Sequence, residues 1–212
     1  MDRKLYSLFP TPVLEMQYHC SDDILHALNN EEMNAEVDGY GIFSKDTYLL
    51  DKEIYKPLAD EIKLQAMDIM REVLSLDVNE IMISQAWVSH KPPGAIHESH
   101  THGNSYFSGV YYFEEDDEPI EPITFQKNFI PGNFNTLYVA TDTSRADDKP
   151  FAWDFYKLYP SPGTLIFFPS WLAHKVDVNK SNKIRKSLAF NLLPKRLGTQ
   201  IKLNELILHG RK

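Results

Sequence analysis

Three residues that can bind a metal, Glu98, His100 and His102, occupy every second position at the start of the segment HESHTHGNSYFSGVYYF, residues 97–113. Side chains two positions apart in an extended strand lie on the same face. Imidazole and carboxylate groups are common metal ligands. The spacing therefore predicts a metal site on this face. By the same alternation His97 lies on the opposite face, where we expect it to support a ligand or to face solvent.

A second segment, residues 161–193, supplies His174 after the apolar run LIFFPSW, and then Arg185 and Ser187. The position of His174 at a tight turn favours a ligand that joins the histidines of the first segment. Arg185 and Ser187 lie on one face of the strand-like run IRKSLAFNLL. A guanidinium group binds a carboxylate through two hydrogen bonds, and a hydroxyl two residues away can add a third. The segment therefore predicts a pocket for an acidic cosubstrate beside the metal.

The composition limits the classes of protein that fit. The chain has 212 residues, of which 42% are hydrophobic and 25% charged, and this predicts one globular domain. A net charge of -8 argues against a nucleic-acid partner. The single cysteine, Cys20, forms no internal disulfide, and no secretory signal or apolar run of about 20 residues is present. We therefore expect a cytoplasmic protein without a membrane partner.

The elements that position these residues fall into two groups. A proline-containing edge strand is predicted over residues 8–18, and Ser21 is predicted to cap a helix that runs through Leu28. A longer helix, capped by Asp51, is predicted from apolar residues at helical spacing. These residues are Ile54, Leu58, Ile62, Ala66, Met70 and Val73. We expect this amphipathic helix to cover one side of a sheet.

After Asp77 the pattern changes to short β-rich segments between proline, glycine and acidic turns. Such a series after a helical region predicts a sandwich or jelly roll with helices packed outside it. Residues 114–119 and 141–150 are predicted to form exposed loops. The longer stretch 127–150 is a candidate lid over the mouth of the barrel.

The sequence resembles a known family. It is similar to the iron(II)- and 2-oxoglutarate-dependent oxygenases, in particular a branch of small oxygenases found in bacteria and phages. The similar segments are the His-x-His pair followed by SGVYYF, the runs PSPGTLIFFPSWLAH and RKSLAFNLL, and the opening LFPTPV. If a phage encodes the protein, the expected location is the host cytoplasm. The resemblance implies a mainly β fold with N-terminal α-helices, a double-stranded β-helix (jelly roll, cupin-like). It also implies a single oxygenase domain over 1–212. Within it we expect a helical support region (1–76), a jelly-roll core (77–194) and a C-terminal extension (195–212).

By this resemblance His100 and His174 match two iron ligands. Arg185 matches the arginine that binds the far carboxylate of 2-oxoglutarate, and Ser187 completes the Arg-x-Ser pattern. Tyr112 is similar in position to a tyrosine that bonds the same carboxylate, although either Tyr111 or Tyr112 can be the residue that faces inward. The implied cofactors are Fe(II), the cosubstrate 2-oxoglutarate and O₂. The implied reaction couples decarboxylation of 2-oxoglutarate to hydroxylation of a substrate C–H bond.

The sequence departs from the broader superfamily at one position, because His102 stands where that superfamily has Asp or Glu. Three arrangements are open: three histidine ligands, a carboxylate ligand from Glu98, or a position left for water or an anion. The retained spacing of the triplet favours His100, His102 and His174.

Two other classes of function compete with the oxygenase. A metal-binding cupin with isomerase or lyase activity needs the histidines but not Arg185 and Ser187. A non-catalytic jelly-roll binding protein needs neither, and its platform would be Trp153, Phe155 and Tyr156. For an oxygenase, the prime substrate is a small molecule or a peptidyl side chain, contacted by residues 34–50 and 127–150. The sequence leaves the oligomeric state open.

Overall fold

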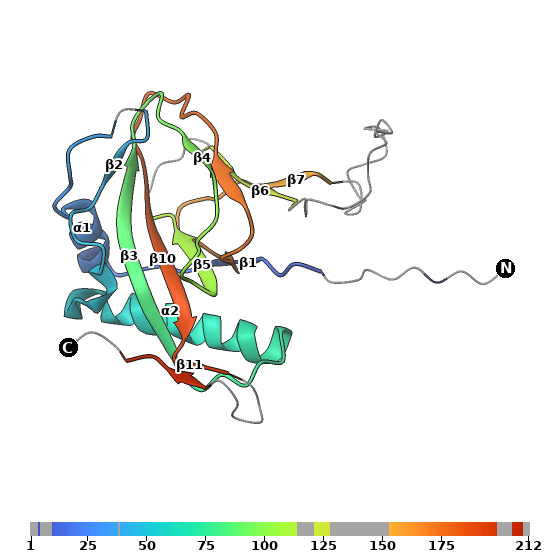
Figure 1. Cartoon of the computed structure of the whole chain (residues 1–212). Coiled ribbons are helices and arrows are strands. Elements are labelled where there is room, and N and C mark those ends of the chain that lie inside the picture. Colours follow the sequence, from blue (N-terminus) through green and yellow to red (C-terminus); the bar gives the residue numbers. More distant parts are fainter. Residues whose placement is uncertain are drawn as a thin grey trace.

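The fold of the chain, given by a computed structural model, is mainly β (Figure 1). The structure describes residues 4, 10–37, 39–113, 121–127, 153–198 and 205–209. Within these ranges the α-helices are α1 (Asp22–Asn29) and α2 (Lys56–Asp68). The helical turns are η1 (Leu49–Asp51), η2 (Glu53–Tyr55) and the π-helical η3 (Ile69–Val73). The strands are β1 (Leu14–Gln17), β2 (Ile42–Phe43), β3 (Ile81–Lys91), β4 (His97–His100), β5 (Phe107–Tyr111), β6 (Ile123–Gln126), β7 (Phe155–Leu158), β8 (Thr164–Pro169), β9 (His174–Val176), β10 (Arg185–Pro194), β11 (Arg196–Leu197) and β12 (Leu206–Ile207).

Two antiparallel sheets build the barrel. The large sheet has the strand order β1-β8-β5-β10-β3-β2, and the small sheet has the order β4-β9-β6-β7. Strands distant in the sequence alternate within each sheet, as in a jelly roll. The predicted fold class is confirmed, and β1 lies at an edge as predicted. Strands β11 and β12 form a separate antiparallel pair, after β10 in the chain.

Strand β8 lies between two apolar clusters and contributes side chains to both. All six of its residues are buried. Leu165 and Phe167 belong to the cluster that the helices cover, whereas Ile166 and Phe168 pack with Ile123 and other residues of the cluster between the sheets. A strand covered on both faces needs apolar side chains at successive positions. This requirement explains the unbroken run LIFF.

Helix α2 covers the outer face of the large sheet (Figure 1). Leu58, Ile62 and Ala66 lie one turn apart on its buried face, as predicted. The predicted cap at Asp51 is wrong, because Asp51 ends η1 and the turn η2 intervenes before α2 begins. Ile54 is 43% exposed and Val73 is 63% exposed, so neither extends the apolar face. They lie in η2 and η3, whose periods differ from that of an α-helix.

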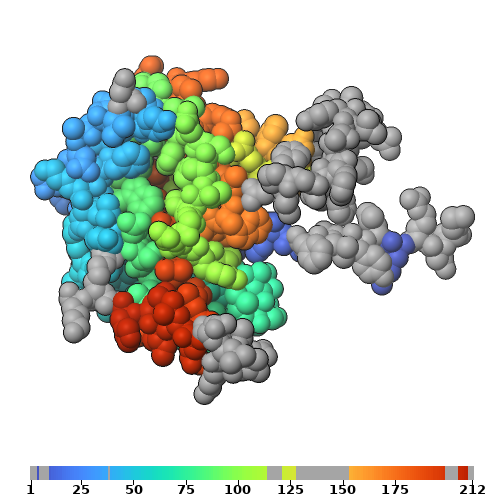
Figure 2. Space-filling view, in the orientation of Figure 1, coloured from blue at the N-terminus to red at the C-terminus, as the bar shows by residue number. Residues whose placement is uncertain are grey.

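Ser21 occupies the predicted N-cap position of α1, but its side chain makes no capping hydrogen bond. Figure 2 shows the blue and cyan N-terminal segments along one side of the molecule, beside the strands. Strands β1 and β2 come from the first 76 residues and yet join the large sheet. Within the described part of the chain, no helix is long and apolar enough to cross a membrane. Residues 114–119, 141–150 and all but the start of 127–150 lie outside the described residues.

Candidate metal centre and adjoining pocket

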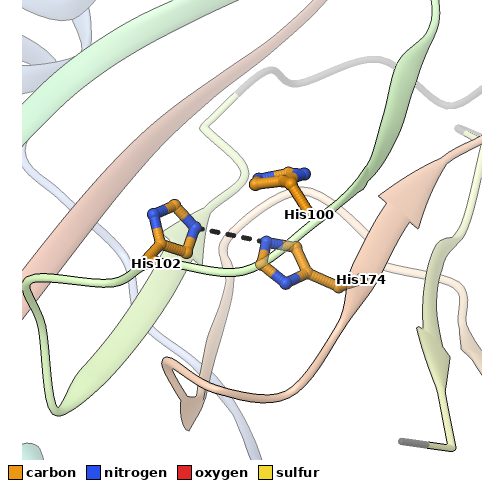
Figure 3. A group of neighbouring side chains, drawn as sticks. All are labelled: His100, His102 and His174. Atoms are coloured by element: carbon orange, nitrogen blue, oxygen red, sulfur yellow. Dashed lines mark hydrogen bonds between the residues drawn. The ribbon is translucent and has the colours of Figure 1, made fainter. Parts of the chain in front are cut away.

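The structure brings together the three histidines that the sequence singles out. One ring nitrogen from each of His100, His102 and His174 lies within 4.8 Å of the others. His100 ends β4, His102 follows it, and His174 begins β9, the strand that pairs with β4 (Figure 3). The Nε2 atoms of His102 and His174 are 3.3 Å apart. In zinc sites an imidazole nitrogen lies about 2.1 Å from the metal. Two such nitrogens whose bonds to one metal meet at a right angle would lie about 3 Å apart.

Backbone carbonyls orient two of the rings. The Nδ1 atom of His100 lies 2.8 Å from the carbonyl oxygen of Glu98, and Nδ1 of His174 lies 2.9 Å from that of Leu172. A carbonyl oxygen only accepts, so each Nδ1 carries the proton and donates. Each Nε2 is then unprotonated and can bind a metal. The same carbonyl contact fixes the tautomer of metal-binding histidines in general.

Burial keeps two of these rings neutral. Burial first, together with the neighbouring histidines, lowers the pKa of His174 to about 3 and that of His102 to about 4. A neutral imidazole is the form that binds a metal. The donor set therefore fits a divalent transition metal such as iron.

A buried hydroxyl network holds the loops that carry His102 and His174. The backbone N–H of His102 donates to the carbonyl oxygen of Ser170 at 2.9 Å. The side chain of Ser170 contacts the hydroxyl oxygens of Ser105 and Ser108, each at 2.8 Å. Ser108 also donates to Oδ1 of Asn191 at 2.7 Å. The network joins the two loops to strands β5 and β10.

His97 does not lie on the face that strict alternation predicts. It lines the same cavity as His100, and the two rings stack with centroids 4.2 Å apart. The register of β4 against β9 shifts between these residues, which breaks the alternation. The prediction that His97 lies on the opposite face is therefore wrong. Its position beside the candidate ligand His100 agrees with the predicted supporting role. Burial lowers the pKa of His97 to about 3.

Glu98 lies away from the cavity. Its side chain is exposed and accepts a hydrogen bond from the Tyr40 phenol, whose pKa is raised by this contact. Glu98 is absent from the residues that line the cavity in the described part of the chain.

Strands β3 and β10 form the wall of the cavity next to the histidines. Alternate residues of each strand line it, as expected for one face of a sheet. They form three cross-strand pairs: Arg185 with Lys91, Ser187 with Ser89, and Ala189 with Trp87. The wall thus changes from charged at one end to hydroxyl groups and then to apolar side chains.

Arg185 and Tyr112 meet inside the cavity. An Nη2–H of Arg185 donates to the Tyr112 hydroxyl oxygen at 2.9 Å, and its guanidinium carbon lies 4.9 Å from the ring centroid. Burial raises the pKa of the Tyr112 phenol, so the phenol stays protonated. Tyr111 points to the helical side, where its hydroxyl donates to the carbonyl oxygen of Tyr18 at 3.1 Å. Of the two tyrosines, Tyr112 is therefore the one that faces the cavity.

Sequence reasoning missed two residues of this wall, Ser89 and Lys91. Both are buried and line the cavity. The alternation of Trp87, Ser89 and Lys91 was visible, but only the pairing of β3 with β10 places it opposite Arg185.

Comparisons with known proteins identify the family. Residues 85–191, just over half of the chain, match the model of the family described as "Putative 2OG-Fe(II) oxygenase". The chain therefore belongs to the 2-oxoglutarate- and Fe(II)-dependent oxygenases, and it is an enzyme of this class with Fe(II) and 2-oxoglutarate as cofactors. The match includes all the candidate residues named above for the metal and the cosubstrate. No curated protein matches the chain.

Solved structures share the fold at low sequence identity. A prolyl-4-hydroxylase from Pseudomonas putida has a TM-score of 0.56 and 16% identity, over 86% of this chain and 92% of that one. The carbocyclase SnoK from nogalamycin biosynthesis has a TM-score of 0.59 and 10% identity, over 95% and 90%. HygX from Streptomyces hygroscopicus, crystallised with nickel and 2-oxoglutarate, has a TM-score of 0.51 and 10% identity, over 87% and 83%.

Proposed function

We propose that this oxygenase is a hydroxylase that couples 2-oxoglutarate decarboxylation to oxidation of a substrate C–H bond. The observation that carries the proposal is that Arg185 lies in the same cavity as the three clustered histidines. A metal-binding cupin with isomerase or lyase activity does not need a buried arginine there, and a binding protein needs neither group.

The metal ligands in this proposal are His100, His102 and His174. Their nitrogens face one another, and two of the three rings have the tautomer that leaves Nε2 unprotonated. The alternative ligand Glu98 is less favourable because its carboxylate is exposed and bonded to Tyr40. Three ligands on one side of an octahedral metal leave three positions for the cosubstrate and O₂.

The far carboxylate of 2-oxoglutarate is proposed to contact Arg185, Ser187 and Tyr112. Arg185 is only 5% exposed, and its Nε has no hydrogen-bond partner among the described residues. A buried donor without a partner is costly, so an acceptor is expected there when the site is filled. Two parallel hydrogen bonds from the guanidinium would fix the direction of the acid.

Bound iron supplies the redox chemistry of this class, in which O₂ is used to decarboxylate 2-oxoglutarate and oxidise the substrate. The protein positions the reactants. Arg185, Ser187 and Tyr112 hold one end of the cosubstrate. Apolar side chains between the sheets, such as Val110, Ile123 and Phe168, exclude water from the reacting centre.

The prime substrate is proposed to be a small molecule or a peptidyl side chain. The structural relatives include proteins described as a prolyl-4-hydroxylase, an epimerase and a carbocyclase, so the fold itself does not select one substrate. In the predicted substrate segment 34–50, the backbone of Tyr40 and the ring of Phe43 contact Lys91 of the cavity wall. The net charge of -8 gives no reason to propose nucleic acid.

The domain organisation stays as proposed from the sequence: one domain over 1–212, with regions 1–76, 77–194 and 195–212. The cluster of apolar residues under α1 and α2 supports one domain, because it includes side chains from both of the first two regions.

Conversion of 2-oxoglutarate to succinate tests the proposed function. The purified protein with Fe(II), O₂ and a panel of peptides and small metabolites should form succinate, and one class of added substrate should raise the rate and gain one oxygen atom. The His174→Ala variant serves as the control without metal. Metal-dependent turnover of a substrate without succinate formation would favour the cupin alternative instead.

A further inference from the structure

Two cationic side chains lie opposite each other inside the cavity. Arg185 on β10 and Lys91 on β3 are direct cross-strand partners, and they are 5% and 2% exposed. Directly opposed residues of an antiparallel pair have Cβ atoms about 5 Å apart, and like charges there are destabilising. Burial increases the cost because water no longer screens the charges. This arrangement needs a compensating group.

No protein carboxylate compensates them in the described structure. The residues that line the cavity in this part of the chain include no Asp or Glu. The Nζ of Lys91 donates to the backbone carbonyl of Tyr40 and lies 4.5 Å from the Phe43 ring centroid, and both contacts are with neutral groups. Arg185 contacts the neutral Tyr112. Among the described residues neither cation has a carboxylate partner, so a bound anion would compensate both.

Unused donors surround the same place. Arg185 Nε and the Ser89 hydroxyl are buried and have no hydrogen-bond partner among the described residues. The carbonyl of Tyr40 takes one of the three N–H donors of Lys91 and leaves two. A carboxylate offers about four lone-pair positions. It can therefore accept hydrogen bonds from donors on both strands.

The backbone beneath Lys91 is fixed. The side chain of Asn179 donates to the carbonyl oxygens of Lys91 at 2.7 Å and Lys183 at 2.8 Å, so it ties the end of β3 to the turn before Arg185. Only the flexible part of the lysine side chain needs to turn toward a ligand. Burial and the charge of Arg185 lower the pKa of Lys91 to about 8, which leaves the amine charged at neutral pH.

We propose that Lys91 and Ser89 on β3 form the second half of the carboxylate site, facing Arg185 and Ser187 on β10. This inference rests on the proposed function, since the ligand is the far carboxylate of 2-oxoglutarate. The two halves make the pocket selective for a 2-oxo acid with a second carboxylate. A purely structural role for Lys91, that of holding residues 40–43 against the barrel, predicts no such selectivity.

Anaerobic titration of the Mn(II)-loaded protein with two acids separates these roles. The acids are 2-oxoglutarate and 2-oxopentanoate, which has the same chain without the far carboxylate. Lys91→Met should weaken 2-oxoglutarate binding by about 30-fold or more, and Ser89→Ala by about fivefold. Binding of 2-oxopentanoate should stay unchanged in both variants. Lys186→Met, on the opposite face of β10, is the matched control and should bind both acids normally.

Each outcome decides the matter. If Lys91→Met and Ser89→Ala bind 2-oxoglutarate as the wild type does, or lose both acids equally, the inference is wrong. If Lys91→Met does not fold, Lys91→Gln and Ser89→Ala carry the same comparison. A wild type that binds neither acid would overturn the proposed function itself. If Arg185→Ala weakens 2-oxoglutarate binding but Lys91→Met and Ser89→Ala do not, this inference alone is overturned.

Discussion

The Nε2 atoms of His102 and His174 lie 3.3 Å apart, although 72 positions separate the two residues in the chain. Pairing of β4 with β9 produces this proximity, because His100 is the cross-strand partner of His174 and His102 follows two residues later. Two ring nitrogens at this separation can bind one metal with small side-chain adjustments. The metal proposal depends on this relationship.

Single alanine substitutions of the proposed ligands should remove tight metal binding. His100→Ala, His102→Ala and His174→Ala should each lower Fe(II) or Mn(II) affinity by more than about 100-fold, because loss of a ligand exceeds the typical effect of its supporting partners. The fold should persist, since the main core lies elsewhere. Metal titration and circular dichroism check this, with the exposed His26→Ala on α1 as the control.

Glu98→Gln distinguishes the remaining ligand arrangement. Because Glu98 is exposed and bonded to Tyr40, the amide variant should bind the metal as the wild type does. Retained stoichiometric binding in His102→Ala together with loss in Glu98→Gln would show that the carboxylate is the third ligand.

The half-buried His90 should make the protein less stable in acid. Burial, and then the charge of Lys186, lowers the pKa of His90 from 6.5 to about 4. Between these values the unfolded chain binds more protons than the folded one, so this contribution to stability is present above about pH 6.5 and is lost as the pH falls through about 4. His90→Gln lacks this proton uptake. Thermal unfolding of the metal-free protein should therefore show that the stability of the variant rises relative to that of the wild type as the pH falls from 7 to 5. A difference in stability that stays constant over this range would contradict the lowered pKa of His90.

Gly109 should not tolerate a side chain. A Cβ atom there would lie 2.3 Å from Cζ of Phe190 and 2.5 Å from the carbonyl oxygen of Ile166. The carbonyl belongs to a paired strand and cannot move away. Gly109→Ala should lower the free energy of unfolding by about 1 to 3 kcal/mol. Gly103→Ala, where no atom lies within 4 Å, should be nearly neutral in the same denaturant titration.

Local patterns were sufficient to predict much of the fold and of the candidate site. The spacing of Leu58, Ile62 and Ala66 predicted the face of α2 that the core buries. The alternation of Arg185 and Ser187 placed both correctly on the face that lines the cavity. Such patterns work because they depend only on the repeat of a single element.

The features that were missed depend on more than one element. The position of His97 follows from a register shift between β4 and β9, which residue types alone do not reveal. The start of α2 follows from two short helical turns that replace the first turn expected at Asp51. The importance of Lys91 follows from its pairing with Arg185, 94 residues further on. Whether Tyr111 or Tyr112 faces inward depended on strand register in the same way.

The affinity for 2-oxoglutarate in wild type and Arg185→Ala tests the central claim most directly. Truncation of a buried, charge-assisted partner typically costs about 2 to 5 kcal/mol, so anaerobic titration should show a loss of roughly 30-fold to several thousand-fold. Arg185→Lys should recover only part of it, because an ammonium group lacks the two-pronged geometry. Fe(II) affinity, measured alongside, should stay unchanged. Equal binding of 2-oxoglutarate by wild type and Arg185→Ala would contradict the cosubstrate site described here.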